Sequence, residues 1–178
     1  RNRASFWSFH WHDHHRNVRR NGFLDDDYRR PPLTWNAQTK EVAALVAGAA
    51  AVTPLLPFAP FFVGTLYYSA WNYYRVHKRS HLDPEWARKN LPWHYDHHMG
   101  PNPNANWCVT KPWFDYVMGT RVVSSADLKE QNPLGIRLPT ALAKPLSQAV
   151  EKIFPAKWVE KKEKPQLVSD INVVDGAA

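Results

Sequence analysis

The sequence predicts an all-α, integral-membrane protein made of a transmembrane helical hairpin and a cytoplasmic, histidine-rich helical cap. Two observations predict this fold class. Thirty consecutive residues from Val42 to Trp71 carry no charge, and a membrane-spanning helix needs roughly 20 apolar residues. All nine histidines fall into three short clusters on either side of that stretch. Scattered surface histidines would not cluster in this way, so the clusters indicate a metal-binding cap.

The composition favours a membrane protein and argues against other classes. Aromatic residues make up 13% of the 178 residues and include nine Trp, and Trp and Tyr prefer the boundary between water and lipid. The formal net charge of +7 would also suit nucleic acid. However, the Lys and Arg residues are spread along the polar segments and form no recognisable binding motif, so we expect no nucleic-acid partner. Cys108 is the only cysteine, which excludes a cysteine-rich zinc site.

The first histidine cluster is FHWHDHHR, which contains His10, His12, His14 and His15. On an α-helix, residues three or four apart share a face. His10 and His14 therefore converge, and His15 lies at the edge of their face. His12 points to the opposite side and is only a possible extra ligand. Asp13 lies inside the cluster and is expected to accept a hydrogen bond from a ligating ring.

The uncharged stretch is predicted to form a helical hairpin. Pro54, Pro57 and Pro60 interrupt it, and a proline removes a backbone donor and clashes with the preceding turn. We predict one helix over residues 39–53 and a second over residues 61–81, joined by the proline-rich turn. Basic residues flank both outer ends, so the positive-inside tendency places these ends, and the histidines, on the cytoplasmic face. The alternative is a long buried hairpin of a protein outside the membrane.

Two further histidine clusters follow the hairpin with the same helical spacing. They contain His77 and His81, and then His94, His97 and His98. Imidazole suits Fe, Zn, Cu and Ni, and eight convergent ligands exceed the four that a structural zinc takes. We therefore predict a site for two metal ions, which the hairpin assembles by returning its ends to one side. Asp96 and Asp115, like Asp13, are expected to orient ligating rings.

The character of the sequence changes after Arg121, where the histidines stop. We predict a histidine-box domain over residues 1–121 and a C-terminal extension over residues 122–178. An amphipathic helix is expected near residues 139–154, and a polar tail follows it.

The clusters resemble the histidine boxes of the fatty acid hydroxylase and sterol desaturase superfamily. FHWHDHHR is similar to the central box, and YYRVHKRSH with LPWHYDHH is similar to the paired late boxes of the fatty acid 2-hydroxylase branch. NANWCVTKPWFDYVMGT is similar to the segment after the last box. The family's upstream histidine pair has no counterpart here. We expect the chain to be N-terminally truncated, and loss of that box is the alternative.

The resemblance implies an integral-membrane di-iron oxidoreductase of lipid metabolism. With O2 as co-substrate and electrons from an external redox partner, it would hydroxylate or desaturate a fatty acyl, sterol or other lipid-like substrate in the membrane. Two iron ions, with zinc possible in either position, would be held by His10, His14, His15, His77, His81, His94, His97 and His98. The hairpin would form the substrate channel, with candidate walls at Phe61, Phe62, Tyr67, Trp71 and Tyr74.

Two other functions stay open at this point. The chain could be a structural or assembly subunit of a larger membrane complex that keeps the hydroxylase-like fold without turnover. A zinc-dependent hydrolase is a third option, but the sequence has no HExxH box or comparable carboxylate-bearing motif.

Overall fold

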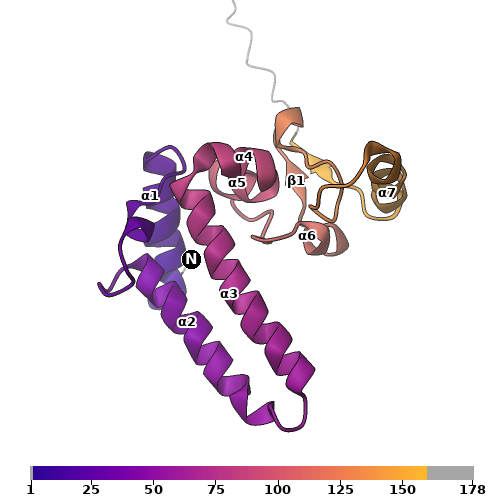
Figure 1. The fold of residues 1–178 in the computed structure, drawn as a ribbon. Coiled ribbons are helices and arrows are strands. Elements are labelled where there is room, and N and C mark those ends of the chain that lie inside the picture. The colour runs from indigo at the N-terminus through magenta and orange to yellow at the C-terminus, as the bar shows by residue number, and fades with distance from the viewer. Residues whose placement is uncertain (1, 160–178) are drawn as a thin grey trace, which may run out of the picture.

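The computed structural model describes residues 2–159, in which seven α-helices are the main elements (Figure 1). In chain order the elements are the π-helix η1 (His10–His14), α1 (His15–Arg20), the 3-10 helix η2 (Asp26–Arg29), α2 (Ala37–Val52), the 3-10 helix η3 (Thr53–Leu55), α3 (Pro60–Leu82), α4 (Pro84–Asn90), α5 (Pro92–Met99), α6 (Trp113–Val117), β1 (Val122–Val123), the 3-10 helix η4 (Ala126–Leu128), α7 (Thr140–Ile153) and β2 (Lys157–Trp158). Within the described residues, the one departure from an all-α fold is the parallel pairing of β1 with β2.

The helices α2 and α3 form a hairpin that projects from the rest of the molecule (Figure 1). Asn36 precedes α2, and its side chain caps the helix by accepting a hydrogen bond of 2.9 Å from the Thr39 N–H. α3 begins with Pro60, and proline suits a first helical turn because the N–H it lacks would be unpaired there. The helix bounds lie within two residues of those predicted from the three prolines.

No helix within residues 2–159 combines the length and the apolar character needed to cross a membrane. α2 has 16 residues, fewer than the roughly 20 that a span requires. α3 has 23 residues, but its last two turns carry Arg75, Lys78 and Arg79. The predictions of a transmembrane hairpin, an integral-membrane fold and an integral-membrane location on the cytoplasmic face are therefore wrong. The uncharged stretch is long because two shorter helices and a turn adjoin in the sequence.

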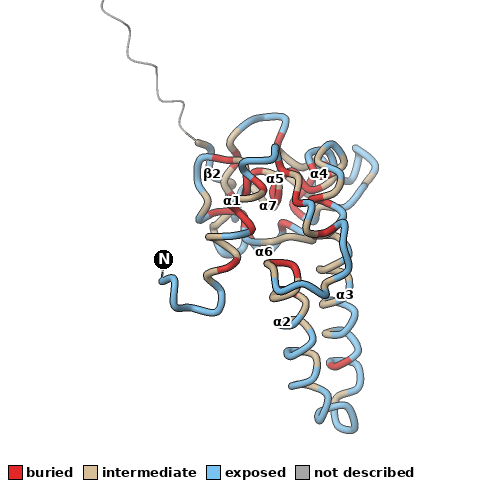
Figure 2. The backbone as a smooth tube through the Cα atoms, turned by 90° about the vertical axis from the view of Figure 1, so that its left-hand side faces the viewer, coloured by how far each residue is buried: buried red, intermediate tan, exposed pale blue. Residues whose placement is uncertain are grey.

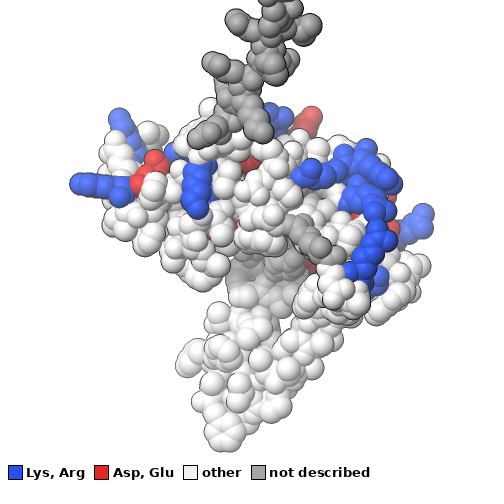
Figure 3. Space-filling view, turned by 180° about the vertical axis from the view of Figure 1, so that it is seen from behind, with Lys and Arg blue, Asp and Glu red and all other residues white. Residues whose placement is uncertain are grey.

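The two ends of the hairpin differ in charge and burial. Its far end carries no charged side chains, whereas Lys, Arg, Asp and Glu gather on the remainder of the molecule (Figure 3). Apolar side chains are exposed there, and Phe58 and Phe61 have 86% and 90% of their surface accessible. Buried residues concentrate instead where α1, α4 and α5 surround the other end of α3 (Figure 2). We call this part the head.

The head is held by a small apolar core and by a buried ionic network. Val18, Phe23 and Ala87 form the core. Arg121, which is 1% exposed, pairs with Glu130 at 2.6 Å and lies 3.7 Å from Asp96. Paired buried charges of this kind fix geometry because either partner alone would be costly to bury.

The C-terminal extension contains the predicted amphipathic helix as α7, residues 140–153. Contacts tie the start of the extension to the head, since the Ser124 N–H donates to Asp96 at 2.9 Å. The predicted polar tail beyond Lys161 lies outside the described residues. The division at residue 121 stays a prediction.

Candidate metal centre

The three histidine clusters meet in the head, where η1, α1, the end of α3 and α5 come together. Seven histidines form two groups, and within each group the ligand atoms lie within 4.8 Å of one another. Group A contains His14, His77, His81 and His98, and group B contains His10, His15 and His97. This buried cluster of histidines could hold a metal ion.

The π-helix η1 divides the first cluster between the two groups. The His15 N–H donates to the His10 carbonyl oxygen, an i to i+5 bond that widens the turn by one residue. The Nε2 atoms of His10 and His15 consequently lie 3.1 Å apart. His14 turns to the other group, although regular α-helical spacing paired it with His10. Two neighbouring histidines thus serve two different groups.

Three of the four rings in group A are fixed by an oxygen acceptor at Nδ1. The pairs are His14 with the Asp25 carboxylate at 2.9 Å, His77 with the Glu41 carboxylate at 2.5 Å, and His81 with the Phe23 carbonyl at 3.0 Å. A carboxylate or a carbonyl oxygen only accepts, so each Nδ1 must carry the hydrogen. In the neutral ring, Nε2 then presents a lone pair.

Those lone pairs converge on one another. The Nε2 atoms of His77 and His81 lie 3.1 Å apart, and neither has a hydrogen to share. His14 Nε2 and both ring nitrogens of His98 are buried without a hydrogen-bond partner. Leaving a buried polar atom unpaired costs about 1–3 kcal/mol. A cation could be bound by the Nε2 atoms of His14, His77 and His81 and by one ring nitrogen of His98, so the donor set fits a metal ion.

Group B has fewer ligands, and one of its rings is also fixed by an oxygen acceptor at Nδ1. His97 Nδ1 donates to the Ala105 carbonyl oxygen at 2.7 Å, so its Nε2 also presents a lone pair. His10 is partly exposed, whereas His15 and His97 are buried. Three protein ligands are typical of metal sites that keep a coordination position open for water or substrate.

The remaining two histidines have different positions. His94 belongs to neither group, but its Nε2 lies 3.4 Å from His81 Nε2, so it adjoins group A. His12, the least favoured ligand, also belongs to neither group. His98 packs against both groups, with ring centroids 4.9 Å from His14 and 4.3 Å from His15.

Burial keeps the rings in the neutral form that binds metals. Burial, and then the neighbouring imidazoles, lower the pKa of His10 to about 3. Burial lowers the pKa of His97 to about 4, although the hydrogen bond to Ala105 opposes the shift. The pKa values of His81 and His98 are well below the ordinary range for the same first cause. A ligand that is already deprotonated does not have to release a proton when metal binds.

Sequence reasoning missed the two carboxylates that fix group A. Burial opposes the ionisation of Glu41, but His77 and the Tyr28 hydroxyl, which donates at 2.6 Å, outweigh it and lower the pKa of Glu41 to about 2. Asp25 holds His14 in the same way. A signal for Glu41 was present, because it is the only acidic residue between Asp27 and Asp83 and it stands at the edge of the apolar stretch.

The carboxylates that were expected to orient ligating rings make other contacts. Asp13 is more than half exposed and lies 3.6 Å from Lys40. Asp96 accepts from both the N–H and the hydroxyl of Ser124. It lies two residues from both His94 and His98, about 200° around α5, and therefore faces away from them.

Asp115 is likewise occupied away from the rings. It accepts from the Trp107 and Cys108 N–H groups, at 2.8 and 3.0 Å, and from the Thr120 hydroxyl at 2.7 Å. These bonds fix the loop after α5, which also supplies the Ala105 carbonyl to His97. Asp115 thus supports group B through the backbone and not through a direct contact.

A cavity of about 270 Å³ opens beside both groups. Its walls are mostly apolar, and three histidines form its inner end. The lining includes Trp7, Phe9, Leu45 and Tyr73, with His10, His14 and His77. None of the expected channel residues Phe61, Phe62, Tyr67, Trp71 and Tyr74 lines this cavity. Phe61, Phe62 and Tyr67 lie farther along α3, whereas Trp71 and Tyr74 line a separate groove with residues of α2. The walls of the cavity come from the N-terminal segment, α2 and the part of α3 around Tyr73 and His77.

Comparison with known proteins gives no match to a family model, a curated protein or a solved structure. The resemblance of the histidine boxes to the hydroxylase and desaturase superfamily therefore stays a prediction from its motifs. The case for a metal centre depends on the ring geometry alone.

Proposed function

We propose that this chain is a di-iron oxygenase that uses O2 to hydroxylate or desaturate an apolar, lipid-like substrate. The observation that carries the proposal is the pair of adjacent histidine groups that meet at His98. Group A offers four imidazoles and group B three, and ligands of this type suit redox metals such as iron as well as zinc.

Iron supplies the chemistry that the side chains lack. Breaking an unactivated C–H bond with O2 requires a redox centre, and two bound iron ions would provide it. Group A would hold one ion and group B the other. The chain has no nicotinamide or flavin fingerprint, so an external partner would deliver the electrons.

The protein's own part is to bind and orient the substrate. Phe9, Leu45 and Trp7 line the cavity and would hold an apolar segment next to His10, His14 and His77. The volume of about 270 Å³ lies just below the 300–1,000 Å³ typical of ligand pockets. We therefore expect one slender apolar end of the substrate to enter while the rest stays outside. The same walls exclude water from the reacting carbon.

The test is metal analysis and O2 consumption of the purified full chain. The protein would be loaded with Fe(II) under anaerobic conditions, and its iron content and Mössbauer spectrum measured before and after exposure to O2. We expect two iron ions per chain in a coupled pair, and O2 uptake that an added long-chain acyl substrate increases.

Two outcomes would contradict the proposal. Tight binding of zinc, with no redox response from the iron-loaded protein, would indicate a hydrolytic or structural zinc centre. Less than one metal ion per chain would leave a non-catalytic structural or assembly subunit as the better explanation.

A further inference from the structure

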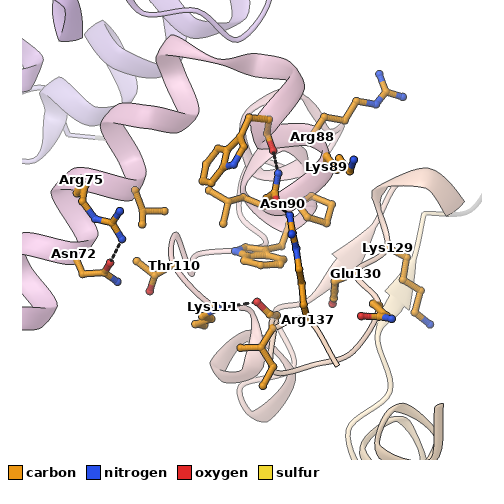
Figure 4. Close-up of a pocket in the computed structure, with 18 of the residues that line it drawn as sticks. Asn72, Arg75, Arg88, Lys89, Asn90, Thr110, Lys111, Lys129, Glu130 and Arg137 are labelled. Carbon is orange, nitrogen blue, oxygen red and sulfur yellow. Dashed lines mark hydrogen bonds between the residues drawn. The ribbon is translucent and has the colours of Figure 1, made fainter. Parts of the chain in front are cut away.

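A second cavity, of about 770 Å³, lies apart from the histidines, and none of the nine lines it. It is an open cleft lined by α3, by α4 and the start of α5, and by the loops around residues 110 and 127–137. Figure 4 shows Arg75 and Asn72 on α3 at one side, Thr110 and Lys111 below, and Arg137 reaching toward Asn90. We call it the basic cleft.

The basic cleft has an excess of positive charge. Six of its lining side chains are Lys or Arg, and only Asp127 and Glu130 are acidic. Asp127 is already paired with Arg88, and Glu130 is paired with the buried Arg121 at 2.6 Å. Lys129 has its own partner, Glu151, at 2.6 Å. The two acids of the cleft are thus already paired and do not balance its other cations.

Four cations remain without a carboxylate partner within residues 2–159. They are Arg75, Lys89, Lys111 and Arg137. Their hydrogen bonds go to neutral oxygens, as when Lys111 donates to the Gly135 carbonyl at 2.8 Å and Arg137 to the Asn90 side chain at 3.1 Å. Such bonds position the side chains but leave their charges uncompensated.

The position of Lys111 adds a second argument. Lys111 is an exposed residue, but the surrounding walls of the cleft partly desolvate its ammonium group and lower its pKa. A bound anion would remove that penalty. Arginine guanidinium groups suit the same ligand, because their forked donors match the oxygens of a phosphate.

The other side chains that line the cleft indicate the chemical character of the rest of the ligand. Trp86 and Trp93 line the cleft with Leu91 and Ile136, and Asn72 and Gln131 offer neutral hydrogen-bonding groups. The volume of the cleft falls within the range of small-molecule sites. A concave site of this size suits a compact ligand better than the flat surface of a partner protein. Four separate cations call for a ligand with more than one negative charge.

We propose that the basic cleft binds a small molecule that carries a diphosphate or similar polyphosphate group. Arg75, Lys111 and Arg137 would bind its phosphate oxygens, and Lys89 would add charge at the rim. The proposal is independent of the metal centre, since it uses none of the same residues.

The test is calorimetric titration of the full chain with inorganic pyrophosphate and, separately, with adenosine diphosphate. We expect saturable binding of pyrophosphate that weakens as salt increases. Lys111→Gln and Arg137→Gln should each weaken it about tenfold. Tighter binding of adenosine diphosphate would add a nucleoside to the ligand, and equal binding would restrict recognition to the phosphates. Both results support the cleft.

Matched controls separate a site from general positive charge. Arg20→Gln on α1 and Lys152→Gln on α7 remove exposed cations outside the cleft and should leave binding unchanged. Lys89→Gln alters an exposed side chain and should weaken binding without affecting thermal unfolding, even if Lys111→Gln disturbs its loop. Absence of saturable binding, or equal losses in the control variants, would overturn the proposal.

Discussion

Groups A and B use the same ligand type but are built differently. Group A has four buried histidines, and two of them donate to the carboxylates Asp25 and Glu41. Group B has three histidines, of which His10 is partly exposed, and its outer acceptor is the neutral Ala105 carbonyl. An anionic acceptor makes an imidazole a stronger ligand than a neutral one does. We infer that group A is built for retention of a metal and group B for access to it.

The largest effect is expected where the groups touch. His98 packs against rings of both groups and has no hydrogen-bond partner for either nitrogen. His98→Ala should therefore lower the metal content at both positions and reduce O2 consumption to background, as measured by metal analysis and an oxygen electrode. His12→Ala removes a histidine that belongs to neither group and should change little. Equal losses in the two variants would show that the assignment of His12 is wrong.

The next largest effect on metal binding should differ between the two groups. His97→Ala removes one of only three ligands in group B, whereas His81→Ala removes one of four in group A. We expect the first variant to keep one tightly bound metal ion per chain and the second to lose the tighter ion. Competition with a coloured chelator measures both affinities. Loss of both ions from His97→Ala would mean that the groups form one cooperative site and not two.

The sequence predicted the members of these groups better than their arrangement. Helical spacing predicted eight convergent ligands, of which seven fall into the two groups and His94 only adjoins group A. It also set His12 apart, and three prolines placed the hairpin. The division of His14 from His15 depends on a π-helix, which local spacing does not reveal. Asp25 and Glu41 escaped notice because their partners His14 and His77 are 11 and 36 residues away. The membrane span failed because α2 has only 16 residues and the last two turns of α3 carry Arg75, Lys78 and Arg79.

An intermediate effect on metal affinity is expected at Glu41, one of the two carboxylates that accept hydrogen bonds from group A. Glu41→Gln keeps the size of the side chain but replaces the anion that holds His77, so metal affinity at group A should fall about 10–100-fold. Group B, which Glu41 does not contact, should keep its affinity. The matched control is Glu85→Gln, an exposed glutamate on α4. A loss of metal affinity of the same size at both groups would show that Glu41 does not act on group A alone.

The smallest effect should come from the cavity, which touches His14 and His77 of group A and His10 of group B. Ala44 lines that cavity from α2, and Ala44→Leu would fill part of it without touching a ligand. Because a few methylene groups in an apolar pocket change transition-state binding by a modest factor, we expect kcat/KM to fall about tenfold. Metal content should stay constant. Ala47→Leu, on the exposed side of the same helix, should have no effect on turnover. If substrate instead reaches the metals only from the open side of group B, Ala44→Leu will leave kcat/KM unchanged, and the access path must then lie beside His10 and His15.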